Sequence, residues 1–492
     1  MRLVRETNLN RLDDALGDAI EGAVCAHHRR RLARRGHGRA LDPPQGGTAD
    51  AGGWADTGSF APTGDTRVEL LVDGADALPR MAREIAAAKR HVHVAGWFFS
   101  PDFRMGGGGP TLRSLLADTA ERVHVRVLAW AGAPLPLFHP DRREVRRMRD
   151  ELIGGTRISM ALDANERPMH CHHEKLVIVD DDVAFVGGID LTSLGGQRLD
   201  YSDHPQRDEL GWHDACFRLE GPLVADVAAH FLLRWGELAD DTPPDPRRAA
   251  PVDGGVQAQL VRTVPENLYR GLPRGEFSIA ESYVRALRSA ERLVYLESQF
   301  LWSPELVSIL DRKLRDPPCD DFRVVALLPA HPNNGTDDTR GQLGVLVDAA
   351  KQGGDESRFL ACTLYQSGPG GKPVYVHAKV GIVDDRWLTV GSANLNEHSL
   401  FNDTEVNVVV CDEQLARDAR LRLWSEHLEL PVEEIEGDSA RVIDELWRPL
   451  ARRNAEHLRL HGFTPHRLVM LPHVSRRTQA LWGPLNGLLV DG

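Results

Sequence analysis

Short apolar runs and longer stretches with helical periodicity alternate along most of the chain. After a polar N-terminal region, residues 68–72 predict a strand, 78–89 a helix and 92–94 a second strand. A helix over 112–122 and a strand over 125–130 follow. Apolar strands that alternate with amphipathic helices are typical of an α/β sheet.

The same order returns in the second half of the chain. Residues 278–290 predict a helix, 293–296 a strand, 306–314 a helix and 322–328 a strand. A repeat with so long a period indicates two lobes rather than a stack of small repeats. We therefore expect an α/β fold built by internal duplication. Two similar α/β lobes, each a mixed sheet flanked by helices, would share one active site at the lobe interface.

The pattern divides the chain into four segments. Residues 1–63 predict an N-terminal helix that ends near residue 27, followed by a flexible linker rich in Gly, Pro and Asp. Residues 64–250 and 251–440 predict the first and second lobes. Residues 441–492 have no assigned role in this division and form a C-terminal tail.

Composition narrows the class of protein. The 492 residues are 42% hydrophobic and 27% charged, as in a folded globular protein, with a formal net charge of -13. The acidic balance disfavours nucleic acid as the main partner. The apolar runs are too short to span a bilayer and the N-terminus has no secretory signal, so we expect a cytoplasmic protein. The six cysteines are scattered without a CxxC pair, which fits reduced thiols.

One motif occurs once in each half of the chain. Each copy consists of His-x-Lys, four residues and Asp, followed by a Gly-Gly or Gly-Ser turn and a polar side chain. The chain prefers arginine and has six lysines. Because two of these six stand at the same position of the motif, the two copies are unlikely to have arisen by chance. The first copy is His173, Lys175 and Asp180, with Asp190 after the turn; the second is His377, Lys379 and Asp384, with Ser392 in the turn and Asn394 after it.

The spacing has a chemical interpretation. The strand period of two puts the imidazole and the ammonium of His-x-Lys on one face. The glycine turn lets backbone N–H groups approach an anion, with Ser392, Asn394 or Asp190 able to hydrogen-bond nearby. Two facing copies supply two histidines and two lysines around one phosphoryl group, as double displacement at phosphorus requires. The motifs therefore predict a phosphodiesterase that forms a covalent phosphohistidine.

These motifs resemble those of the phospholipase D superfamily, and the resemblance runs from residue 68 to about residue 430. It implies that His173 is the nucleophile and that His377 is the general acid and base. It also implies that no metal or other cofactor is required. The groups that would hold the phosphate oxygens are Lys175, Lys379, Asn394 and Ser392.

Each imidazole also needs an acidic partner that fixes its tautomer. Glu405, which enters a predicted strand after the second motif, and Asp214, at the equivalent place in the first half, fit by position. The motif residues Asp180 and Asp384 lie off the His/Lys face. We expect a structural role for both, and for Asp190.

Two other interpretations stay open. The run His170-Cys171-His172-His173 offers zinc ligands, although adjacent residues of a strand point to opposite faces and the second half has no matching cluster. Under the phosphodiesterase interpretation, His170 and His172 are pocket walls or solvated residues. A non-catalytic phosphate-binding module with the same fold is the second alternative, which the intact histidines and lysines disfavour.

The motifs do not choose among phospholipid hydrolysis or transphosphatidylation, phospholipid synthesis of the cardiolipin or phosphatidylserine synthase type, and nucleic-acid cleavage. Residues 185–191, 211–214, 218–222 and 297–300 resemble the eukaryotic-type phospholipases D. Aromatic residues near predicted strand ends would suit an acyl-chain entrance or a membrane contact. These are Trp97, Phe98, Phe99, Phe300 and Trp302.

We therefore expect a phospholipase D that acts on phospholipids such as phosphatidylcholine, with water or an alcohol as acceptor. The expected enzyme is a monomer with peripheral membrane contact. Nucleic acid is disfavoured as a partner.

Overall fold

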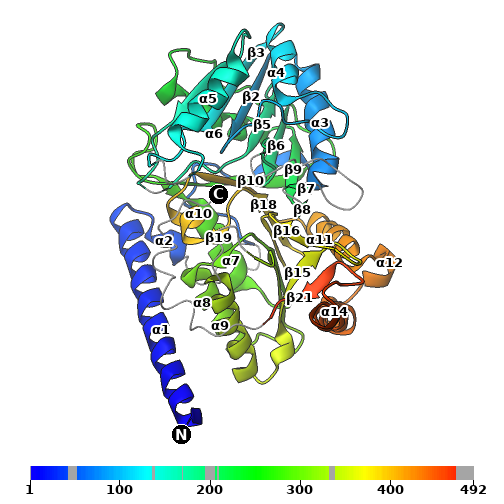
Figure 1. Ribbon diagram of the computed structural model, residues 1–492. Coiled ribbons are helices and arrows are strands. Elements are labelled where there is room, and N and C mark those ends of the chain that lie inside the picture. Colours follow the sequence, from blue (N-terminus) through cyan, green and yellow to red (C-terminus); the bar gives the residue numbers. More distant parts are fainter. Residues whose placement is uncertain are drawn as a thin grey trace.

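Apolar strands from both halves of the chain pair into one large mixed sheet, and helices cover it (Figure 1). The computed structural model describes residues 2–42, 52–135, 139–168, 170–193, 206–207, 210–331 and 338–472. The mixed α/β class predicted from the alternating pattern is confirmed.

In the N-terminal half, β2 (His91–Gly96) is the central strand. It pairs in parallel with β3 (His124–Trp130), which pairs in parallel with β4 (Ser159–Asp163). On its other side β2 pairs antiparallel with β5 (Leu176–Val179). An antiparallel run continues from β5 through β6 (Val183–Gly187) and β9 (Ala215–Glu220) to β1 (Thr63–Val72). The helices of this half are α3 (Asp73–Ala87), α4 (Leu112–Ala120), α5 (Arg142–Ile153) and α6 (Val224–Leu238).

The C-terminal half has the same pairing order. Its central strand β12 (Leu293–Glu297) pairs in parallel with β14 (Arg323–Leu327), which pairs in parallel with β15 (Phe359–Tyr365). On its other side β12 pairs antiparallel with β17 (Val380–Val383). The run continues through β18 (Trp387–Gly391) and β20 (Glu405–Val410) to β10 (Val256–Val264). The helices are α7 (Ser278–Ser289), α8 (Pro304–Arg315), α9 (Asp338–Gln352) and α11 (Glu413–Leu428).

Two strand pairs join the halves. β1 pairs antiparallel with β10, and β8 (Leu210–His213) pairs in parallel with β16 (Pro373–Val376). The remaining short elements lie in the connections. They are α2 (Gly38–Leu41), β7 (Gln206–Arg207), β11 (Glu276–Phe277), β13 (Leu301–Trp302), a 3-10 turn (Glu356–Arg358), β19 (Leu395–Asn396), α10 (Glu397–Phe401), α12 (Val432–Ile435) and α13 (Ser439–Val442).

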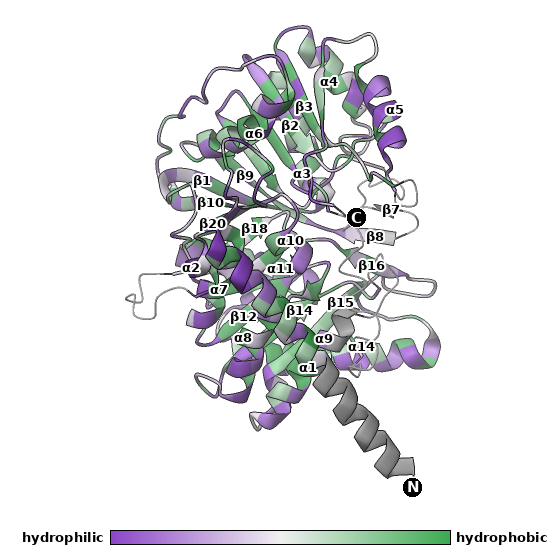
Figure 2. Ribbon diagram, turned by 90° about the vertical axis from the view of Figure 1, so that its left-hand side faces the viewer, coloured by the Kyte–Doolittle hydropathy of each residue, from purple (hydrophilic) through white to green (hydrophobic). Residues whose placement is uncertain are grey.

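The apolar pattern decides which surfaces are buried. Every residue of β5 and β17 is buried, as expected for strands covered on both faces. In α3 the buried residues Ala77, Leu78, Met81 and Ile85 recur at helical spacing and form the stripe that faces the sheet. Figure 2 shows the same division, with hydrophobic central strands and a hydrophilic outer helix α5.

The N-terminal region differs from the predicted short helix and flexible linker. α1 (Arg2–Arg34) continues through the basic stretch. Near its end, Arg31 donates to the carboxylate of Glu266 at 2.8 Å. Further on, the backbone N–H of Ala55 donates to buried Gln259 at 2.9 Å. Polar groups that look solvated in the sequence therefore anchor this segment on the C-terminal half.

The segment after residue 440 is more than a tail. A π-helical turn (Ile443–Trp447), α14 (Arg448–His461) and β21 (Leu468–Met470) extend the C-terminal half. β21 pairs antiparallel with β15, and Trp447 is fully buried. Within the described ranges, none of the helices combines the length and apolar character that a membrane crossing requires.

Candidate active site

The two histidines of the motifs meet in the middle of the molecule. Each His-x-Lys segment lies immediately before a buried strand, β5 or β17, and not inside it as the sequence suggested. The ring centroids of His173 and His377 are 6.5 Å apart and the rings are nearly perpendicular. Both side chains are almost fully buried.

The predicted acidic partners bind the histidines crosswise between the halves. Nδ1 of His173 is 3.0 Å from the Glu405 carboxylate, and Nδ1 of His377 is 2.8 Å from the Asp214 carboxylate. A carboxylate on Nδ1 holds the proton there and leaves Nε2 as the ring nitrogen for chemistry. Sequence position selected both carboxylates but did not show that each serves the histidine of the other half.

Hydroxyl groups hold Glu405 in turn. The hydroxyl of Ser399, in α10, donates to Oε1 at 2.6 Å, and the hydroxyl of Ser392 donates to Oε2. Ser392 was predicted to hold a phosphate oxygen. The structure instead places it behind Glu405, because its hydroxyl is fully buried and directed at that carboxylate.

The two motif lysines have equivalent positions. Lys175 Nζ donates to the carbonyl of His173 at 2.6 Å, and Lys379 Nζ donates to the carbonyl of His377 at 2.5 Å. Lys175 also lies 3.4 Å from Asp190, which was predicted to be structural. Each ammonium is therefore bound to the backbone of its own histidine and adds positive charge beside the imidazoles.

Asn394 lies beside the second motif and is fully buried. Its Nδ2 donates to Gln299 at 3.3 Å, and Nε2 of Gln299 donates to the hydroxyl of Tyr375 at 2.8 Å. The indole of Trp212 lies against His377, with ring centroids 4.8 Å apart. Gln299, Tyr375 and Trp212 were not selected as site residues from the sequence.

The carboxylates of the two motif aspartates accept hydrogen bonds from backbone N–H groups. Asp180 follows β5 with a positive φ of 60°, and its carboxylate accepts N–H bonds from Lys89, Arg90 and His91 at the start of β2. Asp384 follows β17 with φ 53° and does the same for residues 291–293 at the start of β12.

The glycine turns serve close packing. A Cβ on Gly188 would lie 2.2 Å from the Asp214 carboxylate, so only glycine leaves room for this partner of His377. The predicted role as a backbone cradle for phosphate does not fit these turns. The N–H of Gly188 donates to the carbonyl of Ala215, and that of Ser392 to the carbonyl of Val406, each at 2.9 Å.

A buried ionic group supports the His377 side of the site. Nδ1 of His213 is 3.1 Å from Asp73 and Nε2 is 2.8 Å from Glu297. Burial alone would lower the pKa of His213, but Glu297 and Asp73 raise it well above its usual value. The backbone carbonyl of His213 accepts the N–H of His377 at 2.8 Å. His213 precedes Asp214 in the sequence, and this adjacency was the available signal.

A second ionic group lies behind the first motif. Glu174, between His173 and Lys175, accepts hydrogen bonds from Arg234 and, at 2.8 Å, from His230. Burial alone would raise the pKa of Glu174, but Arg234 and His230 lower it to about 2. The polar side chains of His230 and Arg234 among the buried residues of helix α6 were the signal that sequence reasoning missed.

The predicted acyl-entrance aromatics mostly belong to the interior. Phe99 is 1% exposed, and Trp97 stacks on Trp130 with centroids 6.1 Å apart. Phe300 is also buried, whereas Phe98 and Trp302 keep intermediate exposure. Plain packing therefore explains at least three of the five.

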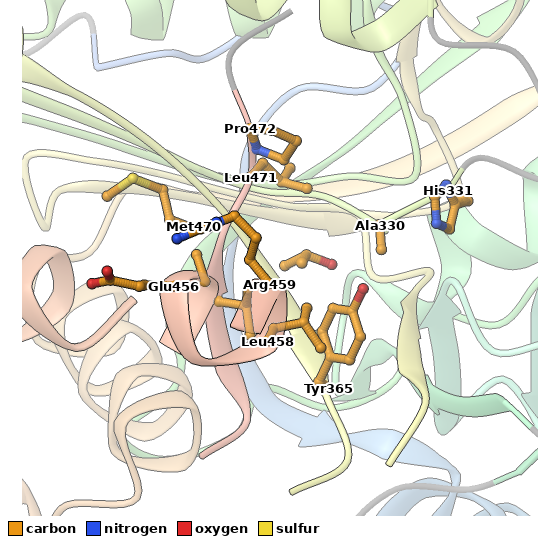
Figure 3. Close-up of a pocket in the computed structure, with 12 residues that line it drawn as sticks. Ala330, His331, Tyr365, Glu456, Leu458, Arg459, Met470, Leu471 and Pro472 are labelled. Atoms are coloured by element: carbon orange, nitrogen blue, oxygen red, sulfur yellow. The ribbon is translucent and has the colours of Figure 1, made fainter. Parts of the chain in front are cut away.

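A mainly apolar pocket of about 580 Å³ lies elsewhere, among β15, β21 and α14 (Figure 3). Thr363, Leu458 and Val469 line it, with Tyr365 and Arg459 among its polar members. Neither motif histidine belongs to this lining, so the pocket is separate from the paired histidines.

Comparisons with known proteins point to one family. A family profile described as cardiolipin synthase, PLD-like domain, matches residues 339–425. Phospholipase D A of Dictyostelium discoideum is 27% identical, over 74% of this chain and 36% of that protein. Phospholipase D1 of Schizosaccharomyces pombe is 25% identical, over 75% of this chain and 36% of that protein. The chain thus spans about a third of the length of both.

Two further matches come from phospholipid synthases. The major cardiolipin synthase ClsA of Bacillus subtilis is 25% identical, over 72% of this chain and 67% of that protein. The crystal structure of phosphatidylserine synthase from Haemophilus influenzae aligns with a TM-score of 0.52 and 13% identity, over 80% of this chain and 94% of that one, which shows a shared fold. The matching profile and the phospholipase D relatives support the phospholipase D superfamily as the family that this chain resembles.

Proposed function

We propose that the chain is a phospholipase D that hydrolyses the head-group phosphodiester of phospholipids or transfers the phosphatidyl group to an alcohol. The observation that carries the proposal is the pair of histidines, 6.5 Å apart between ring centroids, each with a carboxylate on Nδ1 and a lysine beside it. The equivalent pairing order of the two halves supports an internal duplication, with lobes at 64–250 and 251–440 and one site between them.

The proposed reaction has two displacements. Nε2 of His173 attacks phosphorus, and the head-group alkoxide leaves with a proton from His377. His377 then takes a proton from water or an alcohol, whose oxygen attacks phosphorus and releases His173. Lys175 and Lys379 stabilise the charge that develops on the phosphoryl oxygens, and Asn394 is proposed to donate to the same oxygens.

Product analysis tests this proposal. The purified protein is incubated with vesicles of mixed phospholipids plus ethanol, and in parallel with plasmid DNA, with the His173→Ala variant as control. We expect phosphatidylethanol and phosphatidate from the wild type and neither from the variant. Nicked DNA with unchanged lipid would instead identify a nuclease of the same superfamily.

Phosphatidyl transfer between lipids is the second candidate. It is favoured by the larger share of the cardiolipin synthase that the chain spans, 67% against 36% of the Dictyostelium phospholipase D. Vesicles of phosphatidylglycerol without ethanol separate the two activities, because a synthase releases glycerol and forms cardiolipin, whereas a hydrolase forms phosphatidate.

A further inference from the structure

Two histidines and an aspartate converge beside the first motif, outside the phosphoryl chemistry. Nδ1 of His170 is 2.9 Å from Nδ1 of His398. The Asp403 carboxylate lies 3.4 Å from the first nitrogen and 4.0 Å from the second. His170 is more than two hundred positions before His398 and Asp403, so the fold brings the two segments together.

Hydrogen bonds alone leave this cluster incompletely satisfied. Two imidazole nitrogens that face each other share a single proton at most. Oδ2 of Asp403 is completely buried, and no described group donates a hydrogen bond to it. A buried carboxylate oxygen without a donor is costly, whereas a cation between the three side chains would satisfy all of them.

We propose that His170, His398 and Asp403 bind a divalent transition-metal ion, with Zn²⁺ as the best match. Two imidazoles and a carboxylate are common zinc ligands, and tetrahedral bonds of about 2.0–2.1 Å need ligand atoms roughly 3.3 Å apart. The His170 side chain keeps 13% exposure, which gives a water molecule access to the fourth position. The ion is structural and takes no part in phosphoryl transfer.

The buried group around His213 does not offer an equivalent site, although His213, Glu297 and His427 also lie close enough. Glu297 already accepts hydrogen bonds from both histidines, at 2.8 and 3.0 Å. The raised pKa of His213 also keeps its ring protonated, and a protonated ring nitrogen does not bind metal.

The proposed ion would tie together the two segments that form the first histidine pair. His170 is three residues before His173, and Asp403 is two residues before Glu405. The backbone already links these segments, since the N–H of His173 donates to the carbonyl of Thr404 at 3.0 Å. Metal binding therefore stabilises the folded protein and should raise its melting temperature.

Metal titration of the full chain tests the proposal. Protein stripped with EDTA is titrated with Zn²⁺ by calorimetry, and with Co²⁺ by visible absorption, where tetrahedral coordination gives intense d–d bands. We expect one tight site in the wild type, with affinity reduced on the order of 100-fold or more in His170→Ala and in Asp403→Asn. His170 is the more tolerant position because its side chain reaches the surface.

His461→Ala is the matched control, because His457 and His461 are a second pair of neighbouring imidazoles, on α14 and with ring centroids 4.4 Å apart, that does not belong to the proposed site. Unchanged tight binding in this variant supports the proposal. It is overturned if stripped wild-type protein binds no Zn²⁺, if His461→Ala loses the tight site, or if both ligand variants, folded by circular dichroism, keep it. None of these outcomes depends on which phosphodiester the enzyme cleaves.

Discussion

At the scale of single residues, the two histidines have matching surroundings but unequal proposed roles. Each has a carboxylate from the other half on Nδ1 and a lysine on its own backbone carbonyl. His173 is held by a glutamate that two serine hydroxyls also contact, whereas His377 is held by an aspartate packed under Gly188. The nucleophile and the proton donor therefore have to be told apart by experiment.

A substrate with a good leaving group separates the nucleophile from the acid. Phosphatidyl-p-nitrophenol needs no protonation of its leaving group, so His377→Ala should release one equivalent of p-nitrophenol in a burst and trap phosphohistidine. His173→Ala should show no burst. Turnover of natural lipid should fall on the order of 10³-fold or more in both variants. Stopped-flow absorbance and mass spectrometry read the outcome, and a burst in His173→Ala would reverse the assignment.

Removing the charge from Glu405 should impair the chemistry more than the fold. Glu405→Gln keeps the shape but removes the charge that stabilises the imidazolium of His173, so we expect kcat to fall about 10²-fold or more with little change in KM. Ser399→Ala removes one hydrogen bond to the same carboxylate and should cost less than 10-fold, or about 1 kcal/mol. Equal effects of the two substitutions on kcat would contradict the proposed role of Glu405.

At the scale of elements, the turn after each motif strand fixes the start of the neighbouring central strand. Asp180→Ala leaves three backbone N–H groups without their acceptor, so we expect a loss of roughly 3 kcal/mol in the free energy of unfolding, measured in urea. The remaining folded enzyme should keep a kcat within a few-fold of wild type. Asp182→Ala, in the same turn but on the surface, is the control and should change stability by less than about 0.5 kcal/mol.

The elements also show what a single sequence can and cannot predict. The strand 92–94 was found from β-branched residues on both sides of His93, and the strand 293–296 from a continuous apolar run; β2 and β12 contain them. The docking of α1 was missed because it depends on ion pairs such as Arg31 with Glu266, which carry no local signal. The strand β21 was missed because three residues show no periodicity, and only pairing with β15 defines them.

The same limit applies to the site. Repetition of a motif marked the histidines, lysines and aspartates, because it is visible within the chain. The partners His213, Glu174 and Arg234 were missed because the role of each depends on a charged side chain that is distant in the sequence. The hydrogen bond from Ser392 to Glu405 was not predicted, because the sequence does not show where the serine hydroxyl points.

At the scale of the whole molecule, the two halves are held together by strand pairs and by a buried ionic contact. His213 belongs to the N-terminal half and Glu297 to β12 of the C-terminal half, and both are fully buried. Their contact therefore links the relative position of the two halves to a protonation state.

This link predicts a specific dependence of stability on pH. The pKa of His213 is higher in the folded than in the unfolded protein, so protonation of His213 stabilises the fold. This stabilisation is complete below the unfolded-state pKa, near 6.5, and is lost as the pH rises towards the folded-state pKa. The extra stability of the wild type over His213→Gln should thus shrink by about 1.4 kcal/mol per pH unit above pH 6.5 in urea denaturation. His427→Gln removes the other histidine on Glu297, whose pKa burial lowers, so its effect should stay constant from pH 7 to about 9. A constant stability difference for His213→Gln over this range would mean that His213 is neutral in the folded protein, and would remove the charge from the contact between the halves.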